Sequence, residues 1–161
     1  MSRMYRVKIA GRWTEAPKWA LNLPFEVRPM RGFTVAAWPH WRPTLELLAK
    51  ATARAKRKLE WVRIHDHTGT RREPSHPFGW VITETGEMFL CSYDKGTALH
   101  ELAHLISGDS HGDAWARACF ELHRTWLRGA AMANTARLSD EDRLTRFAVS
   151  HPRCPSRGPG H

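Results

Sequence analysis

The chain contains few cysteines, and none of them is close to another in the sequence. Cys91, Cys119 and Cys154 are the only three, and no CxxC pair occurs. An odd, widely spaced set excludes a disulfide framework and a cysteine-type zinc ribbon. Runs of about 18 apolar residues are also missing, which excludes a transmembrane helix. The N-terminus lacks an apolar core of signal-peptide length, and we therefore expect a cytoplasmic protein without a membrane partner.

Acidic residues are scarce in the first half of the chain. The whole sequence of 161 residues has 25 Lys and Arg against 16 Asp and Glu, which gives a net charge of +9. Residues 1–72 contain 16 of the basic residues and only 5 of the acidic ones. Such a basic half favours an anionic partner, and nucleic acid bound through residues 50–72 is one candidate. The solvated face of an exposed helix explains the same charges equally well.

Proline and aromatic residues set residues 1–42 apart from the rest of the chain. Four prolines argue against a long helix there, and six Trp and Phe side chains would be costly to leave in water. We predict an N-terminal arm of short strands or extended chain that packs against a domain over residues 43–150. Residues 151–161 are rich in Pro, Gly and Ser, and we expect them to form a disordered tail.

The domain over residues 43–150 mixes helical and strand patterns. The segment 60–66 is predicted to be a short strand, with Trp61 and Arg63 on one face and Val62 and Ile64 on the other. The full order of predicted elements is a helix that starts at Pro43, the strand over 60–66, a hairpin with strands over 78–83 and 87–93, and helices over 97–106, 113–127 and 138–149.

The most informative motif is HExxH, formed by His100, Glu101 and His104. On a helix, residues four apart lie on one face, so the two imidazoles can bind one Zn²⁺ ion through nitrogen. The Glu101 carboxylate follows the first ligand, where it can accept a proton from a water molecule that the metal activates. His111 comes seven residues after His104, beyond Gly108, and is the predicted third ligand of one zinc ion per chain.

Two other residues are alternative third ligands. Glu121 lies on the helix that follows, as the third ligand of some zinc hydrolases does, and Asp113 stands at the start of that helix. We rank His111 first, Glu121 second and Asp113 third. The competing interpretation of the motif is that the helix histidines are bonded to carbonyl groups and Glu101 is solvated.

The stretch HELAHLISGDSHGDAW, residues 100–115, resembles the zincin metallopeptidases, in particular the small single-domain SprT-like group. In that group a short loop after HExxH leads to a His-Gly pair and an aromatic residue in the next helix, and His111, Gly112 and Trp115 match this pattern. The resemblance covers roughly residues 43–128. It implies an α+β, zincin-like minimal fold with a short mixed sheet of about three strands, a backing helix, the HExxH helix and a following helix.

The chain differs from the metzincins in its motif spacing and from many SprT-like proteins in lacking a zinc ribbon. Metzincins have HExxHxxGxxH, whereas Gly108 and His111 each come one residue later here. Many SprT-like proteins carry a separate zinc ribbon, which the absence of CxxC excludes. The ribbon's absence weakens the expectation of a DNA-associated role, although the basic first half keeps that role open.

The sequence therefore predicts a zinc metallopeptidase that cleaves a protein or peptide substrate, with Glu101 as general base. We expect the strand over residues 87–92 to form an edge of the sheet, where it would align an extended peptide by backbone pairing. The alternative is a non-catalytic module that binds nucleic acid or protein through the basic first half.

Overall fold

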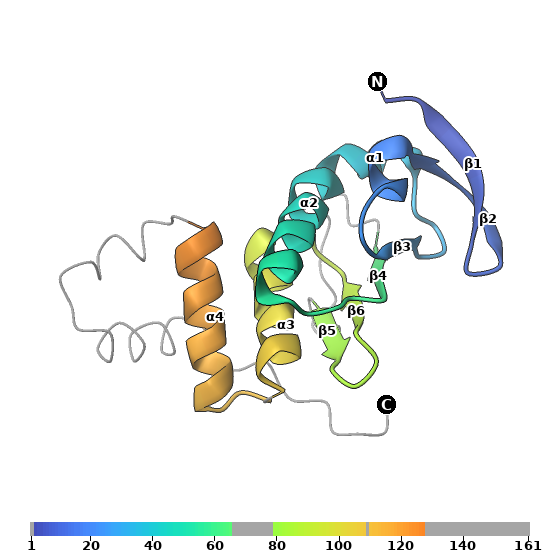
Figure 1. Cartoon of the computed structure of the whole chain (residues 1–161). Helices are drawn as coiled ribbons and strands as arrows, with labels where there is room; N and C mark the ends of the chain where they lie inside the picture. Colours follow the sequence, from blue (N-terminus) through green and yellow to red (C-terminus); the bar gives the residue numbers. More distant parts are fainter. Residues whose placement is uncertain (1, 66–78, 109, 128–161) are drawn as a thin grey trace.

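The computed structural model of the chain describes residues 2–65, 79–108 and 110–127, and every structural statement concerns these residues. Helices and strands are mixed along the chain (Figure 1). Their order is β1 (Met4–Ile9), β2 (Arg12–Pro17), α1 (Lys18–Leu21), β3 (Glu26–Pro29), the 3₁₀ turn η1 (Val35–Ala37), α2 (Trp38–Ala55), β4 (Trp61–Ile64), β5 (Gly79–Ile82), β6 (Glu87–Leu90), α3 (Lys95–Ser107) and α4 (Asp113–Trp126).

The strands form two sheets. The larger has four strands in the order β3-β4-β6-β5, of which β3, β4 and β6 are parallel while β5 runs antiparallel to β6. The smaller sheet is the hairpin β1–β2. The predicted α+β class is confirmed. The predicted strand count was wrong, because β3 comes from the segment that we expected to form a separate arm.

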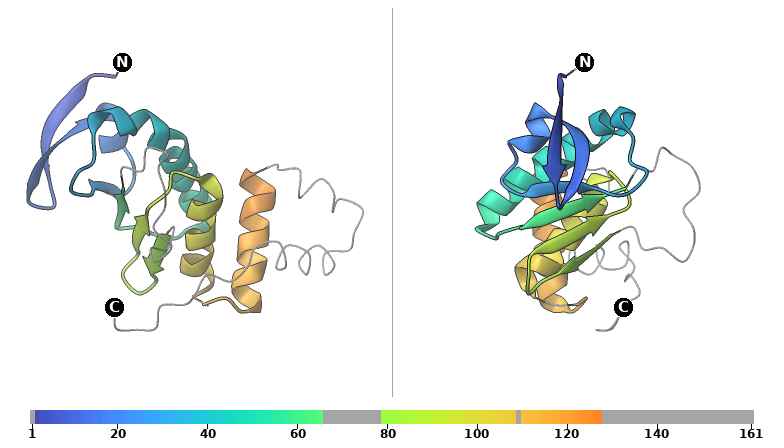
Figure 2. Two further views of the ribbon diagram at one scale, coloured as in Figure 1. Left: turned by 180° about the vertical axis from the view of Figure 1, so that it is seen from behind. Right: turned by 90° about the vertical axis from the view of Figure 1, so that its right-hand side faces the viewer.

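The helices cover one face of the larger sheet. Helix α3 lies at the centre of this layer, where it packs against β5 and β6 of the sheet and against α2 and α4 on its sides. Figure 2 shows α3 and α4 together behind the sheet, with the hairpin β1–β2 on the far side from α4. The side chains that point from the sheet into this layer, Val62, Ile64, Met88 and Leu90, are fully buried. Val62 and Ile64 share one face of β4, as the alternation predicts.

Residues 1–42 are tied into the same hydrophobic core as the following segment. Helix α2 begins at Trp38, five residues before the predicted start, because Pro39 is tolerated in the first helical turn, where backbone N–H groups need no helical partner. The indole N–H of Trp38 donates to the carbonyl of Glu15 at 2.9 Å, and that of Trp41 donates to His65 at 3.1 Å. The two tryptophans thus join the hairpin and the sheet to α2.

The position of β6 corrects a second expectation. Residues 87–92 were expected to form a sheet edge, but β6 pairs with β4 on one side and with β5 on the other. The strand pattern predicted the local hairpin β5–β6, whereas the parallel pairing with β4 joins residues that are far apart in sequence. The edge strand next to α3 is therefore β5.

Two expectations concern residues that the structure does not describe. The helix predicted over 138–149 and the tail over 151–161 lie outside the described residues. Among the helices that are described, none combines the length and the apolar character that crossing a membrane requires.

Candidate metal centre

Helix α3 presents two histidines on one face. Its start is fixed by Asp94, whose carboxylate accepts a hydrogen bond from the backbone N–H of Thr97 at 2.8 Å. Its end is fixed by Gly108 in the left-handed conformation, with φ of 67°. Between these caps, His100 and His104 lie one turn apart, and their ring centroids are 5.1 Å from each other.

The turn after α3 brings His111 back to these two rings. Its Nε2 lies 3.3 Å from the Nε2 of His100, and its ring centroid is 4.6 Å from that of His104. One nitrogen of each histidine can be chosen so that all three lie within 4.8 Å of one another. The three side chains are half-buried. This cluster can hold a metal ion.

The distances in the cluster fit zinc. Two nitrogens that each lie about 2.0–2.1 Å from a tetrahedral zinc ion are about 3.3–3.4 Å apart. The Nε2 atoms of His100 and His111 already have this separation, at 3.3 Å. In the absence of metal the same distance allows one ring to donate N–H to the other. The donor set of three imidazoles is also one that catalytic zinc sites use.

The ring of Trp115 packs against all three histidines of the cluster. Only 2% of its surface is exposed, and its ring centroid lies 4.8 Å from those of His100 and His111 and 5.6 Å from that of His104. Its indole N–H also donates to the backbone carbonyl of His100 at 3.4 Å, a long contact. One rigid ring from α4 therefore contacts all three histidines and limits how far each can move.

Glu101 is buried between α3 and β5. It is 4% exposed, and the described residues provide no hydrogen-bond partner for its carboxyl group. Burial raises the pKa of Glu101 to about 8, because the charged form loses its hydration. A buried carboxyl group that has no partner among the described residues is one that a nearby cation would stabilise, so Glu101 is compatible with a metal centre.

The sequence analysis missed the residue that makes room for Glu101. A Cβ atom on Gly79 of β5 would lie 3.0 Å from the Cγ of Glu101 and 3.0 Å from the carbonyl oxygen of Phe89. Any larger residue at position 79 would therefore require Glu101 or the neighbouring atoms of β6 to shift by a few tenths of an ångström. A glycine inside a strand pattern was the available signal, since such glycines often mark a close approach of another group.

The alternative third ligands do not join the cluster. Glu121 is exposed on α4 and pairs with Arg124 at 2.6 Å, and Asp113 is exposed in the first turn of the same helix. Among the described residues, only the three histidines form a group with metal-binding spacing.

Comparisons of the chain with protein-family models, with curated proteins and with solved structures found no match. The function is therefore argued from the chemistry of the site.

Proposed function

We propose that the protein is a zinc-dependent peptidase whose metal centre is formed by His100, His104 and His111. The observation that carries the proposal is the convergence of these three side chains, together with the buried residue Glu101 on the same helix as His100 and His104. Three histidine ligands leave a fourth position open, which distinguishes a catalytic zinc site from a closed structural one. Zinc in such a site supplies a Lewis acid that polarises a carbonyl group and lowers the pKa of water.

Glu101 would move the proton in this reaction. A base must be ionised before it can accept a proton, and a neighbouring cation favours the ionised form of a buried carboxyl group. The carboxylate then accepts a proton from the attacking water molecule, whose oxygen bonds to the peptide carbonyl carbon. As the carbon–nitrogen bond breaks, Glu101 donates that proton to the leaving amine, and the protein returns to its initial state.

Strand β5 is the element that would align the substrate. It lies at the edge of the larger sheet, packs against α3 and contains Gly79, which contacts Glu101. The described residues place no strand on its other side. A peptide in β conformation that pairs with β5 would lie next to α3, close to the proposed base. This role replaces the one expected for residues 87–92.

The order of elements supports the same assignment. A helix, a strand, the hairpin β5–β6, the HExxH helix and a further helix follow one another, as the resemblance to the SprT-like zincins implies. The zincin-like fold is part of this proposal, together with the choice of zinc as the metal.

The test is the zinc content of the protein purified without chelator, measured by elemental mass spectrometry, together with cleavage of a denatured protein substrate. We expect one zinc ion per chain in the wild type, His40→Ala and Glu101→Gln, and none in His104→Ala. His40 is a matched control, because it is an exposed histidine at the start of α2 and stacks on Tyr93. Cleavage should disappear in Glu101→Gln and His104→Ala and persist in His40→Ala.

Each failure has a separate meaning. A wild-type protein that contains no zinc even after dialysis against it would overturn the proposal. Zinc retained by His104→Ala would place the metal elsewhere. Cleavage retained by Glu101→Gln would remove Glu101 as the base while leaving the metal centre in place.

A further inference from the structure

The face of the larger sheet that points away from α3 and α4 carries arginine and aromatic side chains. The strand register places Arg28 of β3 level with Arg63 of β4, Arg63 level with Phe89 of β6, and Phe89 level with Trp80 of β5. Neighbours in this row stand on the same side of the sheet. Trp61 lies on the same face, two residues before Arg63, and the register places Glu26 of β3 and Glu87 of β6 level with it. In the right-hand view of Figure 2 the strands lie in front of α3 and α4.

The contacts within this row produce flat, partly exposed surfaces. The rings of Trp80 and Phe89 are stacked, with centroids 5.4 Å apart and an angle of 13° between their planes. The ring of Trp61 is contacted by two guanidinium groups, that of Arg28 at 4.7 Å and that of Arg63 at 5.0 Å. Arg63 is exposed and the other members of the row are half-buried. We call these five residues the arginine–aromatic face.

A hollow of about 250 Å³ adjoins this face, between the tip of the hairpin β1–β2 and the sheet. Arg12, Arg28 and Arg63 line it together with apolar side chains such as Met30 and Phe33, and no acidic residue does. In the described part of the chain, neither Arg12 nor Arg63 has a carboxylate partner, whereas Arg28 pairs with Glu26. The hollow therefore presents guanidinium groups that are available to an anion.

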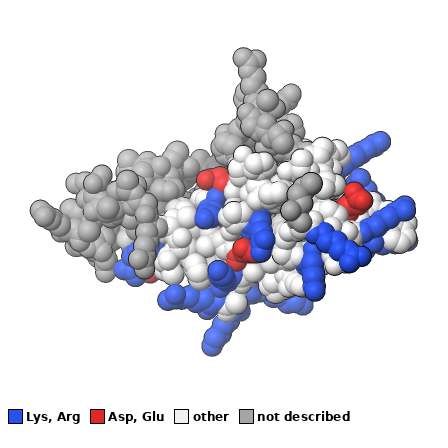
Figure 3. Space-filling view, turned by 90° about the horizontal axis from the view of Figure 1, so that it is seen from above, with Lys and Arg blue, Asp and Glu red and all other residues white. Residues whose placement is uncertain are grey.

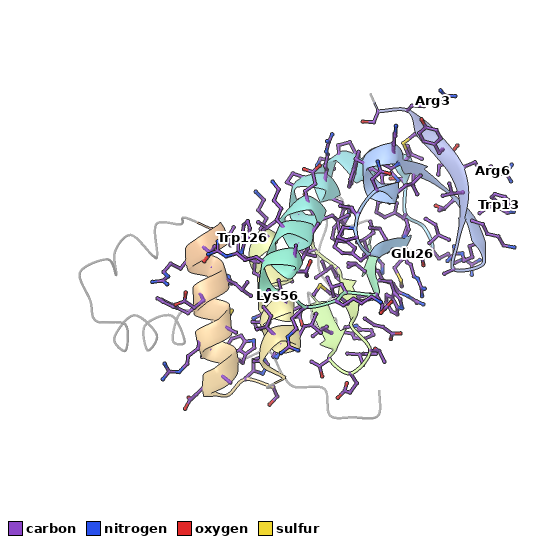
Figure 4. The ribbon with its side chains drawn as sticks, viewed as in Figure 1. Arg3, Arg6, Trp13, Glu26, Lys56 and Trp126 are labelled. Carbon is purple, nitrogen blue, oxygen red and sulfur yellow. The ribbon has the colours of Figure 1, made fainter. Side chains whose placement is uncertain are left out.

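The positive charge extends over the hairpin next to the hollow. Figure 3, which views the molecule from above, shows Lys and Arg side chains at the end that carries the hairpin, with few acidic ones among them, and further basic side chains along the lower edge of the view. On the outer side of the hairpin, Arg6 and Trp13 lie side by side (Figure 4), with the guanidinium carbon 5.2 Å from the indole centroid. Trp13 is 64% exposed, the most of any large hydrophobic residue in the described segments.

We propose that the arginine–aromatic face and the adjoining hollow bind single-stranded nucleic acid. Guanidinium groups in the hollow match the charge of backbone phosphates, and the partly exposed rings of Trp61, Trp80 and Phe89 offer surfaces on which unpaired bases stack. A duplex would hide its bases from these rings. An acidic protein segment would complement the charge of the arginines, but it would offer no planar groups to stack on the aromatic rings.

This binding would not obstruct the metal centre. The three histidines and Glu101 belong to α3 and to the turn that follows, on the helix-covered side of the sheet, whereas the proposed surface lies on the opposite side. Binding of nucleic acid at this surface does not require peptidase activity. Glu101→Gln should therefore bind nucleic acid as the wild type does.

The test is fluorescence anisotropy of a labelled single-stranded DNA of about 16 nucleotides with the full chain, at salt concentrations from roughly 50 to 200 mM. The variant Arg12→Gln/Arg63→Gln should bind at least tenfold more weakly. If Arg12 and Arg63 each contact one phosphate in the wild type, the magnitude of the slope of log affinity against log salt should be smaller by about 1.4 in the variant. Each phosphate contact with a single strand contributes about 0.7 to that slope. Trp61→Leu should lose about tenfold in affinity through lost stacking while the slope stays unchanged.

The matched control is Lys50→Gln/Arg54→Gln, which removes the same charge from exposed positions of α2 on the helix side of the sheet. It should change affinity less than twofold. An equal loss in this control would show general attraction to a basic protein and overturn the proposal. No binding at the lowest salt would overturn it too, as would stronger binding to duplex DNA of the same sequence or equal competition by polyglutamate.

Discussion

The buried carboxyl group of Glu101 makes the stability of the metal-free protein depend on pH. Its pKa is raised from 4.5 to about 8 by burial, so the folded chain keeps a proton that the unfolded chain has already released at intermediate pH. Below pH 4.5 both states are protonated and the residue has no effect. As the pH rises from there to about 8, the wild type loses stability, because the unfolded chain gains free energy by releasing the proton while the folded chain still keeps it.

Glu101→Gln should remove this dependence, since the amide has a similar shape and stays neutral. Each pH unit between 4.5 and about 8 corresponds to about 1.4 kcal/mol, so the variant should become more stable than the wild type by up to about 5 kcal/mol at pH 8 and above. At pH 4.5 the two proteins should unfold with nearly equal free energies.

The assay is urea denaturation in the presence of a chelator, followed by tryptophan fluorescence between pH 4.5 and 8.5. The difference between the two proteins cancels the titration of the nearby histidines to first order. Glu121→Gln is the control, because Glu121 is an exposed glutamate on α4 that pairs with Arg124. It should change stability by less than about 1 kcal/mol. A difference between Glu101→Gln and wild type that stays constant with pH would refute the argument that burial holds the proton.

Three further predictions concern the residues that position the site. Gly79→Ala should retain zinc and lose at least about tenfold in peptidase kcat/KM, because the new Cβ requires Glu101 or the neighbouring atoms of β6 to shift; unchanged activity with normal folding would contradict this. Trp115→Ala should lower the free energy of unfolding in chelator by about 3–5 kcal/mol and weaken zinc binding in a competition assay with a chromogenic chelator, since it removes the ring that contacts all three histidines. Asp94→Ala should cost about 1 kcal/mol in urea denaturation through loss of the cap on Thr97, whereas Asp94→Asn should cost only a few tenths; equal losses would exclude the cap as the cause.

Part of the candidate site followed from the sequence because it depends on local geometry. The spacing of His100 and His104 puts both rings on one face of any helix, whatever surrounds that helix. Gly108 ends the helix, and a short turn then limits where His111 can lie. The alternation over residues 61–64 likewise indicated which residues of β4 share a face, since side chains alternate along every strand.

Strand pairings between segments that are far apart in the chain could not be predicted from the sequence pattern. The parallel pairing of β6 with β4 made β6 a central strand, although its own pattern of residues suits an edge equally well. The addition of β3 enlarged the sheet, because residues 26–29 pair with residues 61–64 across the whole of α2.

The sequence alone determined α3, α4, most of α2, the local hairpin β5–β6 and the spacing of the three histidines, because these follow from backbone periodicity over a few residues. Only the tertiary structure decided that Gly79 of one strand makes room for Glu101 of a helix and that Trp115 contacts all three histidine rings. It also decided that arginines from β2, β3 and β4 line one hollow. Such contacts depend on how distant segments pack against one another. The periodicity within one segment contains no information about its neighbours in space.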